Sequence, residues 1–307
     1  MNSISALDRR DAVDGLAVAL MIGLTLSWGL NGVAAKLTNT GYSPIFLALV
    51  RSALGGVLVY LWCRWRGIRL FERDGTLWAG LLAGGLFGLE FLLIFVGLDY
   101  TSVARSSLLV NTMPFWTLLA GHFFLGEKIS GRKIVGLALA FGGLVLIFSD
   151  KLSLPGPDAL LGDLLSLGGG LAWAATMIVI KGTRLVRIPA EKLLLYQLAV
   201  AAVISALVLP LGGPPIRDGN AVATTALVFQ AVYIIAVTYV LWFWLVQRYP
   251  VSGLSSFTFL TPVFGVLFGG LLLGEPLGVT IFVALGLIVA GLMLVNRSPK
   301  RPISVEQ

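Results

Sequence analysis

Residues 108–146 read LLVNTMPFWTLLAGHFFLGEKISGRKIVGLALAFGGLVL, and residues 256–294 read SFTFLTPVFGVLFGGLLLGEPLGVTIFVALGLIVAGLML. Each stretch holds two apolar runs separated by a Leu-Gly-Glu sequence, and the second copy lies 148 positions after the first. The residues that match at this offset are Pro114 and Pro262, Gly121 and Gly269, Glu127 and Glu275, and Gly143 and Gly291. Matching prolines and turns at one fixed offset favour an internal duplication over chance similarity between apolar segments.

The remainder of each half repeats at an offset of 145 residues. The matching residues are Trp28 and Trp173, Lys36 and Lys181, and Pro44 and Pro189. We therefore expect two structural units of the same kind, residues 1–150 and residues 151–307.

The composition places both units in a membrane. Hydrophobic residues make up 57% of the chain and charged residues 12%, whereas soluble domains are about 25% charged. A soluble protein could not bury that much apolar surface, so lipid is the expected solvent. The net charge of +7 falls mainly in short loops, where the preference for cations on the cytoplasmic side explains it without a nucleic-acid partner.

Ten apolar runs are long enough to cross a bilayer as helices, which takes about 20 residues each. They lie at residues 15–36, 44–63, 75–98, 103–125, 130–149, 159–181, 189–209, 221–247, 251–273 and 277–295. The connections between them are short. The sequence thus predicts an all-α integral membrane protein with ten transmembrane helices.

The distribution of Lys and Arg predicts the orientation. If the N-terminus is cytoplasmic, 17 of the 22 cations fall in cytoplasmic segments and four in outer ones, which is the bias expected of inserted proteins. Both termini are then cytoplasmic. Since each half has five helices, an odd number, the second half starts on the opposite side, and the two repeats are inverted. Inverted repeats with a solute site between them are a common transporter architecture.

A layer of polar side chains is expected in the outer half of the bilayer. At about 1.5 Å per helical residue, Arg51 lies about 11 Å and Glu90 about 12 Å below the outer surface. Trp28 and Asn111 reach a similar level. Ionisable groups at such depth usually pair or face a wet cavity. Arg51 would attract a substrate carboxylate and Glu90 a substrate ammonium; the alternative is a structural ion pair that closes the outer gate.

Further candidates for the cavity lining are aromatic or can form hydrogen bonds. Trp28 and Trp173 lie deep enough to contact a substrate by stacking or cation–π interaction, with helix packing as the alternative. The hydrogen-bonding candidates, which could instead bond between helices, are Asn31, Asn111, Gln230, Ser255 and Ser256.

Four aromatic residues of the eighth predicted helix are also candidates. Tyr233 falls near the middle of this helix. Tyr239, Trp242 and Trp244 fall nearer the cytoplasm, where they would line an inner vestibule. For the two tryptophans, an interfacial belt is the alternative.

Pro114 and Pro262 are expected to kink the fourth and ninth helices, because proline removes a backbone hydrogen bond. Symmetric kinks suit hinges, and the alternative is ordinary tolerance of proline in membrane helices. Glu127 and Glu275 would cap the next helix or pair with nearby cations, with gating as the alternative. His122 lies near the cytoplasmic end of its helix, too far from the polar layer for a proton carrier.

The sequence offers little for enzyme chemistry. Cys63 is the only cysteine and His122 the only histidine, so we expect no intrachain disulfide, thiolate metal site or catalytic triad. No glycine-rich phosphate motif lies in a cytoplasmic loop, which argues against ATP drive. A channel would need a continuous polar stripe or a selectivity filter, and neither is visible in the sequence. We expect a carrier without cofactor or metal, not an enzyme.

Several motifs recur in a fixed order along the chain. They are Trp28-Gly29, Asn31, Lys36, Pro44, Arg51, Pro114 and Leu125-Gly126-Glu127, followed by Trp173, Lys181, Pro262 and Leu273-Gly274-Glu275. In these motifs the chain resembles the ten-helix EamA-type members of the drug/metabolite transporter (DMT) superfamily, and among them most the YddG-type amino-acid exporters. One departure is Tyr196, which stands where the first half has Arg51.

The resemblance implies a central cavity between helices 1–4 and 6–9, with helices 5 and 10 at the periphery. It also implies a secondary transporter that exports or exchanges amino acids, aromatic ones among them, and related small amphipathic metabolites by alternating access. The alternative is a multidrug or nucleotide-sugar-like metabolite carrier of the same superfamily. We expect a monomer in the lipid of a bacterial inner membrane, with the solute, the direction of transport and proton coupling left open.

Overall fold

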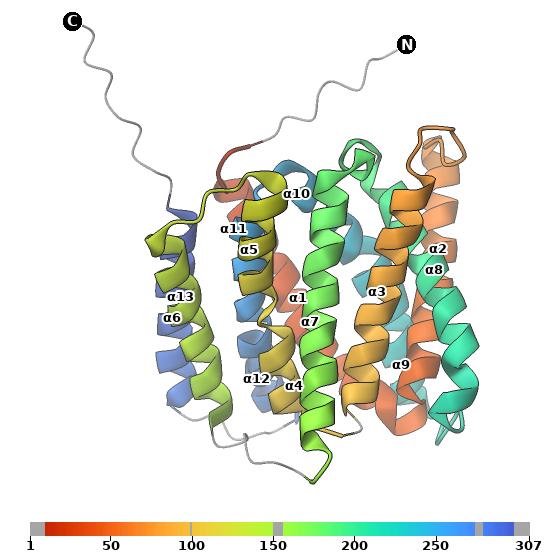
Figure 1. Ribbon diagram of the computed structural model, residues 1–307. Helices are drawn as coiled ribbons and strands as arrows, with labels where there is room; N and C mark the ends of the chain where they lie inside the picture. The colour runs from red at the N-terminus through yellow and green to blue at the C-terminus, as the bar shows by residue number, and fades with distance from the viewer. Residues whose placement is uncertain (1–9, 99, 150–155, 274–278, 298–307) are drawn as a thin grey trace, which may run out of the picture.

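The computed structural model describes residues 10–98, 100–149, 156–273 and 279–297. Their helices stand side by side in one bundle (Figure 1). Within these ranges, nine helical segments are long and apolar enough to span a membrane, and Thr280–Asn296 is a shorter apolar helix. The predicted all-α membrane fold is therefore confirmed, with a helical segment at each of the ten expected places.

The first five spans are built from six helices. These are α1 (Gly15–Gly41), α2 (Pro44–Arg66), α3 (Leu77–Leu98), α4 (Val103–Val110), α5 (Met113–Leu125) and α6 (Gly131–Phe148). The later spans contain α7 (Ala159–Gly182), α8 (Ala190–Val208), α9 (Ala221–Phe229), η4 (Gln230–Thr238), α10 (Tyr239–Arg248), α11 (Val251–Ser256), η5 (Phe257–Phe259), α12 (Leu260–Leu273) and α13 (Thr280–Asn296).

Polar residues at the ends of the apolar runs fix where several helices begin. A side-chain oxygen accepts a hydrogen bond from a backbone N–H three residues further on at the first turn of α1, α2, α6 and α9; the residues are Asp14, Ser43, Ser130 and Asn220. Such caps satisfy donors that the helix itself leaves unpaired. Gly67 and Gly126 end α2 and α5 at φ of 69° and 70°, which glycine adopts without strain.

The helices α6 and α13 pack together at one edge of the bundle (Figure 1). A Cβ at Gly136 would lie 2.6 Å from the carbonyl oxygen of Gly291, and one at Gly143 would lie 2.7 Å from that of Ala284. The two backbones therefore touch, and only glycine permits this distance. Because the contact moves backward along α13 as it moves forward along α6, the two helices are antiparallel.

Two spans are interrupted at nearly equivalent positions of the two halves. The break between α4 and α5 falls at residues 111–112, and the 3₁₀ turn η5 at residues 257–259 interrupts the ninth span. Pro114 and Pro262 follow these breaks, so the interruption expected at both prolines is present. The carbonyl of Val110, which Pro114 cannot bond, lies against Gly170 of α7, where a Cβ would approach it to 2.8 Å. Hinge motion at the two prolines stays a prediction.

The eighth span differs from its prediction as one regular α-helix. Residues Gln230–Thr238 form the π-helix η4 between α9 and α10. A π-segment changes the register of the residues that follow it and occurs often at functional sites.

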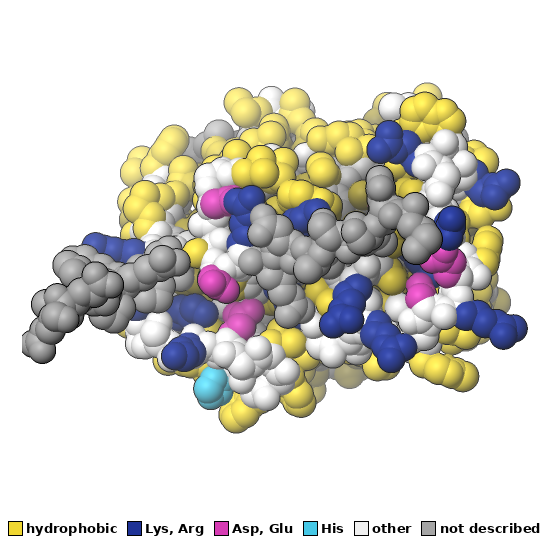
Figure 2. Space-filling view, turned by 90° about the horizontal axis from the view of Figure 1, so that it is seen from above, with side chains coloured by type: hydrophobic (Ala, Val, Ile, Leu, Met, Phe, Trp, Pro, Cys, Tyr) yellow, Lys and Arg dark blue, Asp and Glu magenta, His cyan; other side chains and the backbone are white. Residues whose placement is uncertain are grey.

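The end of the bundle where α1 begins carries many cations. Figure 2 shows Lys and Arg side chains spread over this end face, with hydrophobic side chains around the rim. Val13 and Asn296 both lie against Gly253, so the chain enters and leaves the bundle at the same end. Trp65 and Trp78 are 75% and 81% exposed near this end, as expected of side chains at a membrane interface.

Candidate functional site

Arg51 of α2 and Glu90 of α3 are both buried within the spans, at 4% and 6% exposure. Arg51 interacts electrostatically with Glu90 and with Tyr239. Its guanidinium carbon lies 3.9 Å from the ring centroid of Phe91, a cation–π contact. Arg51 Nε and Glu90 Oε2 have no hydrogen-bond partner among the described residues. The interior thus holds a basic and an acidic side chain with polar atoms that a solute could satisfy.

Aromatic rings form one wall beside this pair. The ring of Tyr239 lies 5.9 Å from that of Phe87 and 6.1 Å from that of Trp28, measured between centroids. Trp28 also meets Trp242 edge to face at 5.4 Å. These rings come from α1, α3 and α10, so aromatic groups from both parts of the chain meet beside Arg51 and Glu90.

Tyr239 and Trp242 belong to the group of aromatic residues that the sequence analysis assigned to an inner vestibule. In the structure Tyr239 interacts with Arg51 and Trp242 packs on Trp28, and a vestibule lined by these residues stays a prediction. Trp242 is only 1% exposed, which excludes it from an interfacial belt.

Hydrogen bonds hold Trp28 in place. Its indole Nε1 donates to Thr238 Oγ1 at 3.0 Å, and the neighbouring Ser27 hydroxyl bonds the Tyr233 hydroxyl at 3.0 Å. Tyr233 is 42% exposed and stacks on Phe229. Trp28 is therefore a fixed part of the aromatic wall. Tyr233 lies at a more exposed position and bonds the neighbouring Ser27.

The amide candidates divide into satisfied and unsatisfied groups. Asn111 Nδ2 bonds the carbonyl of Ser107 at 2.8 Å and so closes the end of α4. Gln230 Nε2 donates to Thr38 at 2.8 Å, but its Oε1 has no partner, and neither has Asn31 Oδ1, among the described residues. Asn31 and Gln230 retain acceptors for a solute, whereas Asn111 stabilises the break in the fourth span.

The remaining candidates have neighbours of their own. Ser255 bonds Thr117 at 2.7 Å, and Ser256 accepts a hydrogen bond from Asn296 at 3.2 Å, so both serines connect helices. Trp173 of α7 is half-buried against the apolar core. These contacts agree with the interhelical alternative for the serines and leave substrate contact a prediction for all three residues.

Gln197 of α8 is a buried polar residue that the sequence analysis did not select. It is fully buried, and neither Nε2 nor Oε1 of its amide has a partner among the described residues. Its neighbour Leu198 packs on Gly56 of α2. Arg51 is five residues from Gly56 along α2, so Gln197 lies about 8 Å from the level of Arg51, toward the end where α1 begins. A single Gln within the apolar run LLLYQLAV was the available signal.

Ion pairs and hydroxyls connect the helices at both ends of the bundle. At one end, Asp163 of α7 accepts hydrogen bonds from Thr101 at 2.7 Å and from Arg105 Nε at 3.2 Å. At the other end, Asp14 accepts bonds from Tyr249 at 3.0 Å and from Arg10. Both carboxylates therefore connect segments that are distant in sequence.

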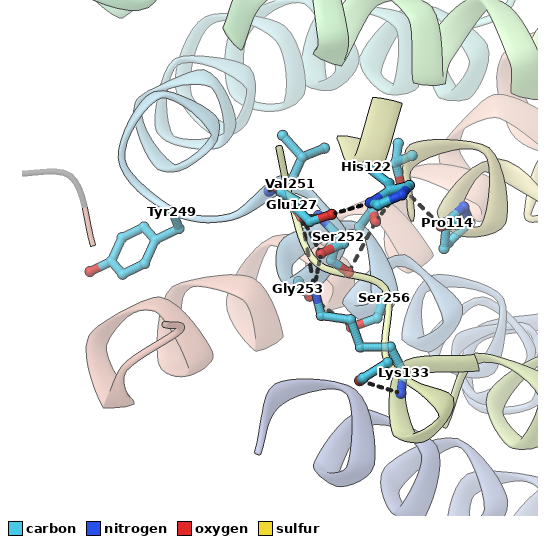
Figure 3. A network of polar contacts seen from close by, with 12 residues as sticks. Pro114, His122, Glu127, Lys133, Tyr249, Val251, Ser252, Gly253 and Ser256 are labelled. Atoms are coloured by element: carbon cyan, nitrogen blue, oxygen red, sulfur yellow. Dashed lines mark hydrogen bonds and ion pairs between the residues drawn. The ribbon is translucent and has the colours of Figure 1, made fainter. Parts of the chain in front are cut away.

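Glu127 adds a second connection at the Asp14 end (Figure 3). Its carboxylate accepts a hydrogen bond from Val251 N at 2.9 Å and one from the Ser252 hydroxyl, and Lys133 Nζ lies 3.9 Å away. The cap is thus made to α11 and not to the next helix, α6, which Ser130 caps. The expected pairing with a nearby cation is present.

His122 and Glu275 are the other two residues that the sequence analysis considered at helix ends. His122 is exposed, and its Nδ1 lies 3.0 Å from the carbonyl oxygen of Glu127, which agrees with a position at the loop. Glu275 lies outside the described residues. Among the residues that are described, no three His, Cys, Asp or Glu side chains form a group that could hold a metal ion.

Among the described residues outside the spans, three ionisable groups have shifted pKa values. The backbone N–H of Ala17, together with Tyr249 and Arg10, lowers the pKa of Asp14. Burial and the bond to Asp14 raise the pKa of Tyr249. Burial alone would raise the pKa of Asp74, but hydrogen bonds from Lys192 and Thr76 outweigh it and lower the pKa to about 2. All three shifts involve contacts at the Asp14 end.

Comparison with known proteins agrees with this architecture. The chain is 28% identical over 290 residues to the uncharacterized transporter YvbV of Bacillus subtilis, covering 92% of both chains. It is also 28% identical to a protein of Escherichia coli named a probable amino-acid metabolite efflux pump, covering 94% of this chain and 95% of the relative. A crystal structure superposes with a TM-score of 0.79 over 91% of this chain and 96% of the other, at 22% identity, which supports the fold.

The model of the EamA-like transporter family matches the chain twice, at residues 15–149 and 160–297. Together the two matches cover the whole helical bundle, including Arg51, Glu90, the aromatic wall and both interrupted spans. The chain therefore belongs to the EamA-like transporter family of the drug/metabolite transporter superfamily.

Proposed function

We propose that this transporter exports or exchanges amino acids, aromatic ones among them, and related small amphipathic metabolites. The observation that carries the proposal is the buried pair Arg51 and Glu90 beside an aromatic wall. A zwitterion with an apolar side chain needs a cation for its carboxylate, an acceptor for its ammonium and an apolar surface. The unpartnered Arg51 Nε and Glu90 Oε2 supply the first two, and Trp28, Phe87 and Tyr239 supply the third.

The named relatives support the same solute class. Proteins of Escherichia coli and of Salmonella typhimurium, 28% and 24% identical to this chain, are each named a probable amino-acid metabolite efflux pump. A carrier of flat drugs or other metabolites is the second candidate, because the aromatic wall would also bind a flat solute without charge. We place Asn31, Gln230 and Gln197 as further hydrogen-bonding groups of the same site.

For the scaffold we propose two inverted five-helix repeats, residues 1–150 and 151–307, that work as a monomer in the inner membrane with both termini cytoplasmic. The packing of α6 on α13 supports the inversion. Gly136 meets Gly291, and Gly143 meets Ala284. At the offset of 148 residues, Ala284 is the equivalent of Gly136 and Gly291 is the equivalent of Gly143, so exchanging the two halves turns each contact into the other. A two-fold axis in the membrane plane requires this equivalence.

Solute flux in proteoliposomes tests the function. Vesicles loaded with an unlabelled amino acid should accumulate the same labelled amino acid by counterflow, with saturation, because a carrier exchanges solute through one site. Aromatic and aliphatic amino acids, a flat cationic drug and a nucleotide sugar form the panel. Counterflow with the drug or the nucleotide sugar but with no amino acid would contradict the proposal.

Arg51 and Glu90 are tested by exchanging their charges. The single variants Arg51→Glu and Glu90→Arg should abolish counterflow of a zwitterion. The double variant should remain inactive or change its preference, because the two charges then meet the solute in reversed order. Full recovery with unchanged preference in the double variant would show a structural pair instead of a binding pair.

A further inference from the structure

A cavity of about 750 Å³ opens at the Asp14 end of the bundle, away from the pair Arg51 and Glu90. Among the described residues, seven cationic and two acidic side chains line it. Its walls come from the loop between α5 and α6, the end of α13, the start of α11 and the residues before α1. The cavity therefore separates the peripheral pair of α6 and α13 from the central helices at the level of the membrane surface.

Three of the cations have capacity for a ligand. The side chains of Lys128 and Arg297 are exposed at the rim, and they make no hydrogen bond or ion pair with any described residue. Arg132 bonds the carbonyl oxygen of Arg297 through Nη2, but its Nε is buried and has no partner in the described part of the chain. Of the two acidic residues, Glu127 is already engaged with α11 and Lys133, so the exposed Asp11 is the one carboxylate set against Lys128, Arg132 and Arg297 among the described residues. The open charge of the cavity is therefore positive.

Exposed apolar side chains adjoin the cavity-lining residues in the sequence. Phe124 of α5 is 73% exposed and Ile134 of α6 is 50% exposed, and both are close in sequence to residues that line the cavity. Leu125 and Val295 contribute apolar surface inside it. An occupant with an anionic head and hydrocarbon chains fits both parts, whereas a small soluble anion would use only the first.

We propose that this cavity binds the headgroup of an anionic phospholipid, with the phosphate near Lys128, Arg132 and Arg297 and the acyl chains along Phe124 and Ile134. Basic pockets between helices at a membrane surface are known to hold such headgroups. The bound lipid connects the loop after α5 to the end of α13. It thus ties the peripheral pair to the central bundle at this end, independently of the solute carried at Arg51 and Glu90.

The test uses the purified full-length transporter in a neutral detergent. Its melting temperature is followed while dioleoyl phosphatidylglycerol or dioleoyl phosphatidylcholine is added. The anionic lipid should raise the melting temperature in a saturable way, because a ligand that binds only the folded state stabilises it. The neutral lipid should raise it less at every concentration. Equal effects of the two lipids would overturn the proposal.

Two double variants separate the cavity from the general surface charge. Lys128→Gln with Arg297→Gln leaves the bond of Arg132 in place and should weaken the binding of phosphatidylglycerol roughly 30-fold. This factor corresponds to about 2 kcal/mol, of which each of the two cations near the membrane surface contributes about half. Arg66→Gln with Arg73→Gln removes two exposed cations outside the cavity and should leave the affinity within about twofold. Equal loss in both double variants would contradict a specific site.

Inorganic phosphate distinguishes lipid from a free anion. Phosphate at millimolar concentration should not reproduce the rise in melting temperature, because it cannot contact Phe124 and Ile134. An equal rise with phosphate, lost in Lys128→Gln with Arg297→Gln, would replace the lipid by a soluble anion and overturn the proposal. Amino-acid counterflow plays no part in these measurements, so they stand or fall separately from the proposed function.

Discussion

Asp163 and Asp14 bind hydroxyl and guanidinium groups at opposite ends of the bundle. Thr101 and Arg105 donate to Asp163, while Tyr249 and Arg10 donate to Asp14. Thr101 and Tyr249 lie 148 positions apart, the offset of the repeated stretch. Each donates to a carboxylate at the start of the first span of the other half. The same type of connection therefore occurs at both ends.

The two connections differ in exposure. The side chains of Arg105 and Asp163 are 18% and 13% exposed, whereas those of Arg10 and Asp14 are 46% and 30% exposed. Exposed ion pairs contribute about 0–1 kcal/mol, but removing one partner of a buried pair is strongly unfavourable. The difference predicts that the Asp14 end opens more easily than the Asp163 end. A nearly symmetric scaffold would thereby prefer one of its two access states.

The variant Asp163→Asn should break the stronger connection and have the largest effect. It leaves Arg105 partly buried without its counter-charge, which should lower the free energy of unfolding by about 2–3 kcal/mol. Part of that loss should appear as opening at this end. In a Cys63→Ala background, a thiol introduced by Ser106→Cys should react with a membrane-impermeant reagent at least about tenfold faster, since about 1.4 kcal/mol is tenfold.

The matched reporter lies at the other end, at Ser252→Cys in the same background. Its labelling should not increase with Asp163→Asn, because alternating access opens one end at a time. Faster labelling at both positions would indicate general loosening, and the comparison between the two ends would then fail.

Two buried glutamines provide the next contrast. Gln247 Nε2 donates to the carbonyl oxygens of Leu185 and Ile188 at 3.0 and 2.9 Å, whereas the amide of Gln197 is unpartnered among the described residues. Gln247→Leu should lower the free energy of unfolding by about 1–3 kcal/mol, because two buried acceptors lose their donor.

Gln197→Leu should instead leave stability unchanged or raise it by up to about 1–2 kcal/mol, because it removes an unsatisfied buried group. Amino-acid counterflow should nevertheless fall if Gln197 bonds the solute. Unfolding titrations and counterflow on the same preparations give both quantities. A Gln197→Leu protein that loses stability and keeps full transport would assign this amide to the scaffold.

The sequence predicted the fold well because its signals are local and strong. Apolar runs of about 20 residues admit few structures other than membrane helices. Pro114 and Pro262 marked both interruptions, since the lost hydrogen bond affects the backbone beside the proline. Arg51 and Glu90 were found because charged residues in an apolar run are conspicuous.

Other features of the structure depend on geometry that the pattern of side chains along the sequence does not encode. The π-helix was not predicted, because residues 230–238 carry no clear composition signal for it. The bond from Glu127 to α11 joins residues 124 positions apart, and spacing along the chain does not reveal it. Gln197 was overlooked because one amide carries no charge, and its lack of partners is a property of the packed structure.

Acid titration tests another contact at the Asp14 end, between Asp74 and Lys192. Lys192 is almost fully buried and Asp74 is partly exposed, at 4% and 27%. The folded-state pKa of Asp74 is lowered to about 2 from 3.8. The contribution of Asp74 to the free energy of unfolding is therefore present above pH 4 and is lost as the pH falls from about 4 to 2. Asp74→Asn should therefore be less stable than wild type at pH 6, by about 1 kcal/mol, with the difference vanishing near pH 2. A constant difference across this range would contradict the assignment.

The smallest effect is expected at the exposed connection itself, from Tyr249→Phe. The change removes the hydroxyl that donates to Asp14 at 3.0 Å but keeps the buried ring. The free energy that keeps the Asp14 end closed should fall by about 0.5–1 kcal/mol. The thiol of Ser252→Cys should then be labelled faster, and labelling of Ser106→Cys should not change. Thr101→Val is the counterpart at the other end, and it should cost more because Asp163 and Arg105 are less exposed. If Tyr249→Phe proved the more damaging of the two, burial would not be what distinguishes the two ends, and the preferred access state would need another origin.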